Sequence, residues 1–170
     1  MLAALLSPTY GVYAGYELYE HVAVRPGSEE YLDSEKYQLR PRDWSTPEQT
    51  LAPYLTMLNR VRREHPALHW LDNIAFHDVD SPDVMAWSKR TVRPDGTDDV
   101  VLVVLNLDPH GAREATVSLD MTALGADWDD HLQVTDQVTG SSYDWAGRNY
   151  VRLDPFDEPA HILTVRVVRP

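Results

Sequence analysis

The sequence predicts a mainly β protein. A carboxy-terminal β-sandwich over residues 70–170 follows a segment, residues 1–69, that carries one strand, a long loop and a helix. Short apolar runs separated by turn signals such as Pro94-Asp95-Gly96 fill the carboxy-terminal part, a spacing typical of β-sandwiches. The stretch 45–65 differs, because its apolar residues recur at helical spacing. The two patterns indicate two structural units that meet near residue 70.

The bulk composition limits the functions that the chain can have. Hydrophobic residues make up 43% of the 170 residues, which is enough for a real core. A formal net charge of −12 argues against nucleic acids and anionic membrane surfaces as partners, because both attract basic proteins. Cysteine is absent, which excludes disulfides and thiolate metal sites and fits a reducing compartment, the cytoplasm.

The amino-terminal zone combines a helix end, a strand and a loop. The first residues, MLAALL, lack the basic lead-in and the cleavage site of a signal peptide, and we interpret them as the end of a helix. The run Tyr10 to Leu18 is aromatic and β-prone but broken by two glycines, which predicts a strand near another backbone or a ligand. Residues 20–44 form a long polar loop, and loops of this length more often have a function than serve only as connections.

The helix at residues 45–65 has the clearest signals of all the elements. Ser45 and Glu48 form a capping box at its start. Pro47 occupies the first turn, where a missing N–H does no harm, and Pro66 ends the helix. These signals predict that the helix begins at residue 45.

Seven short strands are predicted in the carboxy-terminal part. They are Ile74–His77, Val84–Lys89, Val100–Asn106, Glu114–Ser118, His131–Asp136, Tyr150–Leu153 and Ile162–Val168. The run from Val100 to Leu107 is nearly all apolar, which predicts a strand covered on both faces.

The aromatic residues of this part divide into two groups. Trp87 and Tyr150 lie in predicted strands and are expected in the core. Trp128 and Trp145 lie in predicted turns, where exposed rings would form a platform for stacking on a sugar or else pack at the end of the sandwich.

The titratable residues show no complete catalytic or metal-binding motif. No two of the seven histidines have a metal-ligand spacing with partners, and Pro66 breaks the helix that His65 and His69 would need, so no metal and no cofactor is predicted. Neither a nucleophile elbow nor a phosphate-binding glycine loop occurs. Glu17 and Glu20 are expected to have ordinary surface or hydrogen-bonding roles.

Two arginines of the loop, Arg40 and Arg42, have the chemistry to clamp a phosphate. The loop is also rich in acidic residues, so we expect these arginines to form ion pairs instead. The candidate partners are Glu29, Glu30, Asp33 and Asp43.

Two segments carry a specific family resemblance. SPTYGVYAGYELYE (residues 7–20) resembles the closing barrel strand of the maltosyltransferases that use maltose-1-phosphate, a branch of the α-amylase clan. GSEEYLDSEKYQLRPRDW (residues 27–44) resembles the loop after that strand, and ordinary amylases do not share it. The order of helix and sandwich, with RNYVRLDP at residues 148–155, also resembles the end of clan members.

The resemblance implies a fold and an activity. Residues 1–69 would be the closing strand, substrate loop and last helix of a (β/α)₈ barrel. The parent enzyme would transfer maltosyl from α-maltose-1-phosphate to an α-1,4-glucan with retention and release phosphate, and it would be a homodimer. Retention needs two carboxyl groups about 5 Å apart. In the clan these lie on earlier barrel strands, so this chain alone is expected to be inactive.

The resemblance also assigns two substrate-binding residues, Lys36 and Tyr37, which match the pair that contacts the maltosyl unit in the family. Lysine offers three donors to sugar hydroxyls, and tyrosine offers an apolar face with a polar tip. Two other functions stay open. The chain could be a freestanding carbohydrate-binding or interaction module, or part of a trehalose synthase-like isomerase, against which the Lys36–Tyr37 loop argues.

Overall fold

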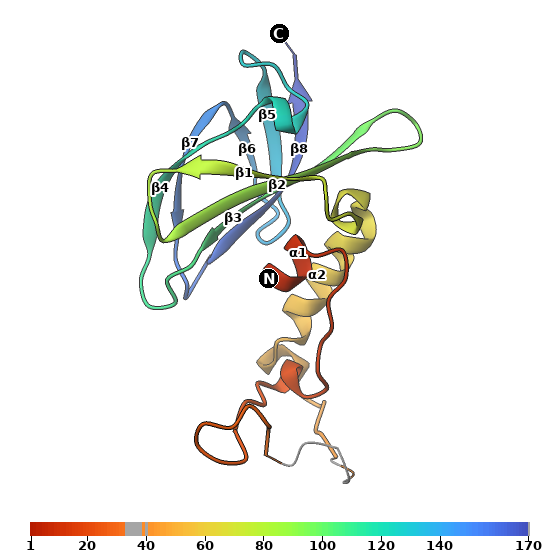
Figure 1. Ribbon diagram of the computed structural model, residues 1–170, viewed down its shortest axis with the longest axis vertical. Helices are drawn as coiled ribbons and strands as arrows, with labels where there is room; N and C mark the ends of the chain where they lie inside the picture. Colours follow the sequence, from red (N-terminus) through yellow and green to blue (C-terminus); the bar gives the residue numbers. More distant parts are fainter. Residues whose placement is uncertain (33–38, 40, 170) are drawn as a thin grey trace.

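The computed structural model describes residues 1–32, 39 and 41–169 and confirms a mainly β protein. One antiparallel sheet of eight strands has the order β6-β5-β8-β3-β2-β1-β4-β7 and curls around a core (Figure 1). The strands are β1 Ile74–Val79, β2 Val84–Val92, β3 Asp98–Asn106, β4 Arg113–Ser118, β5 His131–Asp136, β6 Ser142–Trp145, β7 Arg148–Leu153 and β8 Ala160–Val168. All seven predicted strands are present, and β6 is an addition.

Strand β1 explains why a single curled sheet replaces the two separate sheets of the predicted sandwich. Its first residues, Ile74 to His77, pair with β2. Its last two, Asp78 and Val79, pair with β4 instead. Because β1 exchanges one neighbour for another along its length, it joins the two layers into one sheet.

Two hydrophobic clusters lie on opposite faces of the long strands. Alternate residues of β3 point to opposite sides, so Leu102 and Val104 belong to the cluster enclosed by the sheet, whereas Val101 and Val103 belong to the outer cluster. The outer cluster also contains Trp87, which is fully buried as predicted. The prediction of a strand covered on both faces is therefore confirmed for β3.

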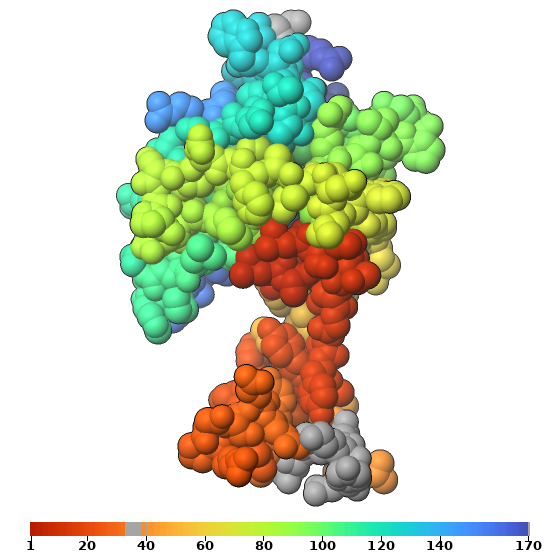
Figure 2. Space-filling view, in the orientation of Figure 1, coloured from red at the N-terminus to blue at the C-terminus, as the bar shows by residue number. Residues whose placement is uncertain are grey.

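Two α-helices cover the outer cluster. They are α1 Leu2–Leu6, the helix end expected from the apolar start, and α2 Ala52–Glu64. Leu5 of α1 and Leu58 and Val61 of α2 are buried against the sheet. In Figure 2 the red amino-terminal residues lie against the body of the molecule, and the orange segment that follows extends away from it.

The predicted start of α2 is wrong. Pro47–Gln49 forms a separate 3-10 turn, and α2 begins only at Ala52. The N-cap is Leu51, which makes no side-chain capping hydrogen bond, and the preceding residue, Thr50, accepts a hydrogen bond from the Ala52 N–H at 3.0 Å through its hydroxyl. The described part of the chain has three further 3-10 turns: Tyr16–Leu18, Pro66–His69 and Thr122–Leu124.

The predicted strand at Tyr10 to Leu18 is also absent. Residues 10–13 have no regular structure, and Tyr16–Leu18 forms a 3-10 turn. An extended segment needs neighbouring strands to satisfy its backbone groups, and none of the described strands lies beside it.

The carboxyl end of α2 is tied to the sheet by a buried carboxylate. Asp99, at the start of β3, is 3% exposed and accepts hydrogen bonds from three donors. These are the ring Nδ1 of His65 at 2.7 Å, the N–H of Ala67 at 2.8 Å and the guanidinium of Arg93 at 2.6 Å. The helix end, the following turn and the β2–β3 hairpin thus share one acceptor.

Among the described residues, no helix has both the length and the apolar character needed to cross a membrane.

Candidate functional site

The two predicted substrate-binding residues, Lys36 and Tyr37, lie outside the described residues. The structure describes the chain up to Leu32, then Leu39, and then the residues from Pro41 onwards. The site is therefore built from the described residues on either side of this pair.

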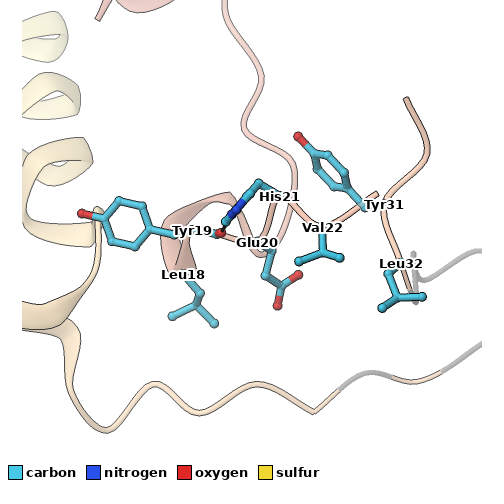
Figure 3. Close-up of a pocket in the computed structure, with 7 residues that line it drawn as sticks. All are labelled: Leu18, Tyr19, Glu20, His21, Val22, Tyr31 and Leu32. Carbon is cyan, nitrogen blue, oxygen red and sulfur yellow. Dashed lines mark hydrogen bonds between the residues drawn. The ribbon is translucent and has the colours of Figure 1, made fainter. Parts of the chain in front are cut away.

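A recess of about 230 Å³ is lined by the segment before the substrate loop and by two residues within the loop, Tyr31 and Leu32. The residues that line it come from two short segments, 18–22 and 31–32, which a backbone bridge between Ala23 and Tyr31 holds together. Figure 3 shows the lining side chains, which are Leu18, Tyr19, Glu20, His21, Val22, Tyr31 and Leu32. In Figure 3 the Tyr19 and Tyr31 rings point in different directions, so these two rings do not form a clamp for a sugar.

The backbone at the edge of the recess has an unusual conformation. Tyr19 is the only described non-glycine residue with a positive φ, at 59°. Its carbonyl accepts a hydrogen bond from the His21 ring at 2.6 Å. Such a conformation costs about 1–3 kcal/mol and persists only where surrounding contacts hold it.

An ion pair supplies part of that support. The Arg42 guanidinium lies 3.0 Å from the Glu20 carboxylate, and both side chains are largely buried. Arg42 also donates to the carbonyl of Ala14 at 3.1 Å. Gly15 packs so close that a Cβ there would lie 2.1 Å from the Glu20 carboxylate, so the tight turn requires glycine. Residues 14–20 are in this way joined to the far end of the substrate loop.

These contacts decide the roles predicted for the charged residues. Glu20 and Glu17 have the expected hydrogen-bonding roles, and Glu17 accepts from the N–H of Gly15 at 3.1 Å. Arg42 pairs with an acid as predicted, and the ion pair within the described residues is with Glu20, which is not one of the four candidates. Arg40 lies outside the described residues.

The structure corrects the predicted positions of two aromatic residues and decides between the two roles that were open for Trp145. Trp145 lies in β6 rather than in a turn and is 7% exposed, so it is a core residue and not a glucan platform. Tyr150 is 63% exposed, because it points outwards from β7 while its neighbour Val151 points inwards. Trp128 is 86% exposed and remains a candidate for sugar stacking.

The two histidines near the end of the predicted helix, His65 and His69, have separate partners. His65 contacts Asp99, and His69 contacts the carbonyl of Arg62 at 2.6 Å. His161, however, converges with Asp136 and Glu158. Sequence spacing missed this cluster, because its members meet only when β5 and β8 pair.

Comparison with known proteins identifies the family. A family model described as "GLGE, C-terminal" matches residues 76–165, more than half of the chain. "Alpha-1,4-glucan:maltose-1-phosphate maltosyltransferase 2" of Streptomyces coelicolor is 56% identical over 98% of this chain and 24% of its own length. The enzymes of Corynebacterium glutamicum and Mycobacterium tuberculosis, named as alpha-1,4-glucan:maltose-1-phosphate maltosyltransferases, are 51% and 49% identical over 96% and 99% of this chain.

The chain spans about a quarter of the length of these relatives. The resemblance first seen in residues 7–44 thus extends over nearly the whole chain. The chain belongs to the GLGE, C-terminal family.

Proposed function

We propose that this chain is the carboxy-terminal part of a retaining maltosyltransferase that transfers maltosyl from α-maltose-1-phosphate to an α-1,4-glucan and releases phosphate. The observation that supports the proposal is the similarity to enzymes of that name over 96–99% of the chain. Residues 1–69 would complete the (β/α)₈ barrel of the parent enzyme, and residues 70–170 would form its carboxy-terminal sandwich. The parent enzyme would be a cytoplasmic homodimer.

Within this function Lys36 and Tyr37 would contact the maltosyl unit. Their neighbours support the assignment, because Arg42 and Glu20 join the loop end to residues 14–20 by a nearly buried ion pair. A loop fixed at its base holds a substrate group at lower entropic cost than a free loop. The catalytic carboxylates would come from the part of the parent enzyme upstream of this chain.

A chimera tests the proposal. The last quarter of the Streptomyces coelicolor relative is replaced by this chain, and phosphate release from α-maltose-1-phosphate is measured with a maltooligosaccharide acceptor. We expect transfer by the chimera and none by the 170-residue chain alone. A folded chimera that releases no phosphate, beside an active parent, would refute the proposal.

Variants of the chimera test the two site residues. Lys36→Ala should lower kcat/KM by about tenfold or more, since a hydrogen bond from a charged group contributes about 1.5–3 kcal/mol. Tyr37→Ala should lower it by a smaller factor, since a neutral hydrogen bond contributes about 0.5–1.5 kcal/mol. Tyr150→Ala is the matched control, because Tyr150 is an exposed ring on β7. Equal losses in Tyr37→Ala and Tyr150→Ala would refute the site assignment.

A glucan-binding module is the second candidate function, favoured by the exposed ring of Trp128. Binding of the whole chain to glycogen, lost in Trp128→Ala, would support it. Conversion of free maltose to trehalose by the chimera would instead indicate an isomerase.

A further inference from the structure

Three side chains from separate parts of the chain converge on one buried point. Asp136 ends β5 and is fully buried. His161, the second residue of β8, is 8% exposed. Glu158 lies in the turn before β8 and is partly exposed. One ligand atom from each lies within 4.8 Å of the other two.

The surrounding backbone orients the Asp136 carboxylate. Its Oδ1 accepts hydrogen bonds from the N–H groups of Val138 at 2.9 Å and Ile162 at 3.2 Å. Its Oδ2 is directed at the His161 Nδ1, 2.9 Å away, and accepts a longer hydrogen bond from the Thr139 hydroxyl at 3.4 Å. The carboxyl group of Asp136 also contacts that of Glu158. Burial opposes the ionisation of Asp136, but hydrogen bonds from His161 and Glu158 lower its pKa. One oxygen is therefore fixed in place while the other faces the cluster.

The second carboxylate competes for the same ring nitrogen. Glu158 Oε1 lies 3.0 Å from His161 Nδ1, the distance of an ion pair. That oxygen is nevertheless buried without a hydrogen bond, because the ring N–H points at Asp136. Burial and the adjacent Asp136 carboxyl raise the pKa of Glu158. The His161 Nδ1 thus lies between an oxygen of Asp136 and an oxygen of Glu158, and the Glu158 oxygen is buried in the cluster without a hydrogen bond.

We propose that Asp136, Glu158 and His161 bind a divalent transition-metal ion, of which Zn²⁺ has the best-matched chemistry. Imidazole and carboxylate ligands suit this ion, whereas Ca²⁺ and Mg²⁺ prefer oxygen ligands alone. Ligand atoms about 2.0–2.2 Å from a tetrahedral ion lie about 3.4 Å apart, so the observed 2.9 and 3.0 Å separations need to widen by only a few tenths of an ångström. Water would supply the fourth ligand on the exposed side of Glu158.

The bound ion would join β5 to β8 at their junction with α2. Val138, which follows Asp136, packs against the outer hydrophobic cluster together with residues of α2. The Asp136 charge also affects Tyr54 of α2. Burial, followed by the charges of Asp136 and Tyr16, raises the pKa of Tyr54 to about 12. The site would thus stabilise the surface on which the helix lies, independently of the proposed transferase function.

The experiment uses the whole chain after treatment with EDTA and measures Zn²⁺ binding by isothermal titration calorimetry. We expect one bound ion per chain and at least a tenfold weaker affinity in Glu158→Gln, which keeps the shape of the side chain. His131→Gln is the matched control, because His131 is an exposed histidine close in sequence to acidic residues. This variant should bind Zn²⁺ with the same affinity as the unmodified chain. At a Zn²⁺ concentration 100-fold above Kd the melting temperature should rise by about 5–10 °C.

A second measurement on the unmodified chain locates the ion. The rings of Tyr143 and Trp145 lie 6.0 and 6.5 Å from the His161 ring, so bound Mn²⁺ should broaden their NMR signals first. Broadening confined to residues 127–131, no binding heat, or an affinity unchanged by Glu158→Gln would each overturn the proposal. In that case a proton, not a metal ion, neutralises the two carboxylates.

Discussion

The substitution Asp99→Asn tests how strongly α2 is held on the sheet. Asparagine keeps one acceptor oxygen, but it loses the charge that His65, Ala67 and Arg93 approach at 2.6–2.8 Å. Removing one partner of a buried ion pair costs about 3–5 kcal/mol. Because the Arg93 side chain is 35% exposed and water screens its share, we expect the lower end, about 3 kcal/mol. A chain of this size loses about 2–4 °C per kcal/mol, so the melting temperature should fall by about 6–12 °C.

Thermal and urea unfolding followed by circular dichroism measure this loss. The matched control is Asp98→Asn. Asp98 pairs with Arg90 on the surface, and both side chains are more than one-third exposed. Such surface pairs contribute at most about 1 kcal/mol to stability. A melting temperature of Asp99→Asn within 2 °C of the control would refute the reasoning.

The pH dependence of stability provides a further check on Asp99. Burial opposes its ionisation, but hydrogen bonds from His65 and Ala67 hold the pKa below the ordinary 3.8. A lowered folded-state pKa contributes stability above the ordinary value, and this is lost as the pH falls through the lowered value. As the pH falls below 3.8, the unmodified chain should therefore lose stability more steeply than the Asp99→Asn variant.

Two further predictions concern the sheet. Trp145→Ala should destabilise the chain by about 3–5 kcal/mol in urea unfolding, because it empties a core position; unchanged stability with weaker glycogen binding would restore the platform interpretation. Gly125→Ala should lower the free energy of unfolding more than Gly140→Ala, although φ is 77° at both positions. A Cβ at position 125 would lie 2.7 Å from the Arg90 side chain, whereas a Cβ at position 140 would have no atom within 4 Å. The left-handed conformation alone costs about 1–2 kcal/mol, so equal losses would show that Arg90 moves freely.

The strands could be predicted because their residues alternate or are apolar throughout. Residues Val100 to Asn106 are buried on both faces of the sheet, and a strand buried in this way has an almost continuous apolar sequence that is easy to identify. Strand β6 was missed for the opposite reason. Its residues Ser142 to Asp144 are exposed, and only Trp145 is buried, so a four-residue edge strand carries almost no apolar pattern.

The errors in residues 1–69 have a different physical cause. A capping box at Ser45 and a β-prone run at Tyr10 are local signals, and tertiary contacts decide whether they are used. Tyr10 instead packs under the Arg62 guanidinium, 5.1 Å from its ring centroid. Arg62 also donates to the carbonyls of Ser7 and Pro8 at 3.0 and 2.6 Å. Contacts over more than fifty residues of sequence thus determine the conformation here.

The candidate sites show the same division. Lys36 and Tyr37 could be proposed because they lie side by side in a recognisable loop, and they stay predictions outside the described residues. The cluster of Asp136, Glu158 and His161 has no such local pattern, since antiparallel pairing of β5 with β8 brings Asp136 opposite Leu163. Only the fold reveals it.

The packing also decides which form of the chain suits these experiments. The proposed boundary at residue 69 crosses the outer hydrophobic cluster, in which Leu58 and Val61 of α2 bury Trp87 and Ile162 of the sheet. A fragment of residues 70–170 would expose these side chains. Exposed apolar surface promotes association, so a glycogen-binding signal from that fragment would not distinguish a sugar site from nonspecific adhesion. Glucan and metal binding should therefore be measured on the whole chain, in which α1 and α2 cover this face.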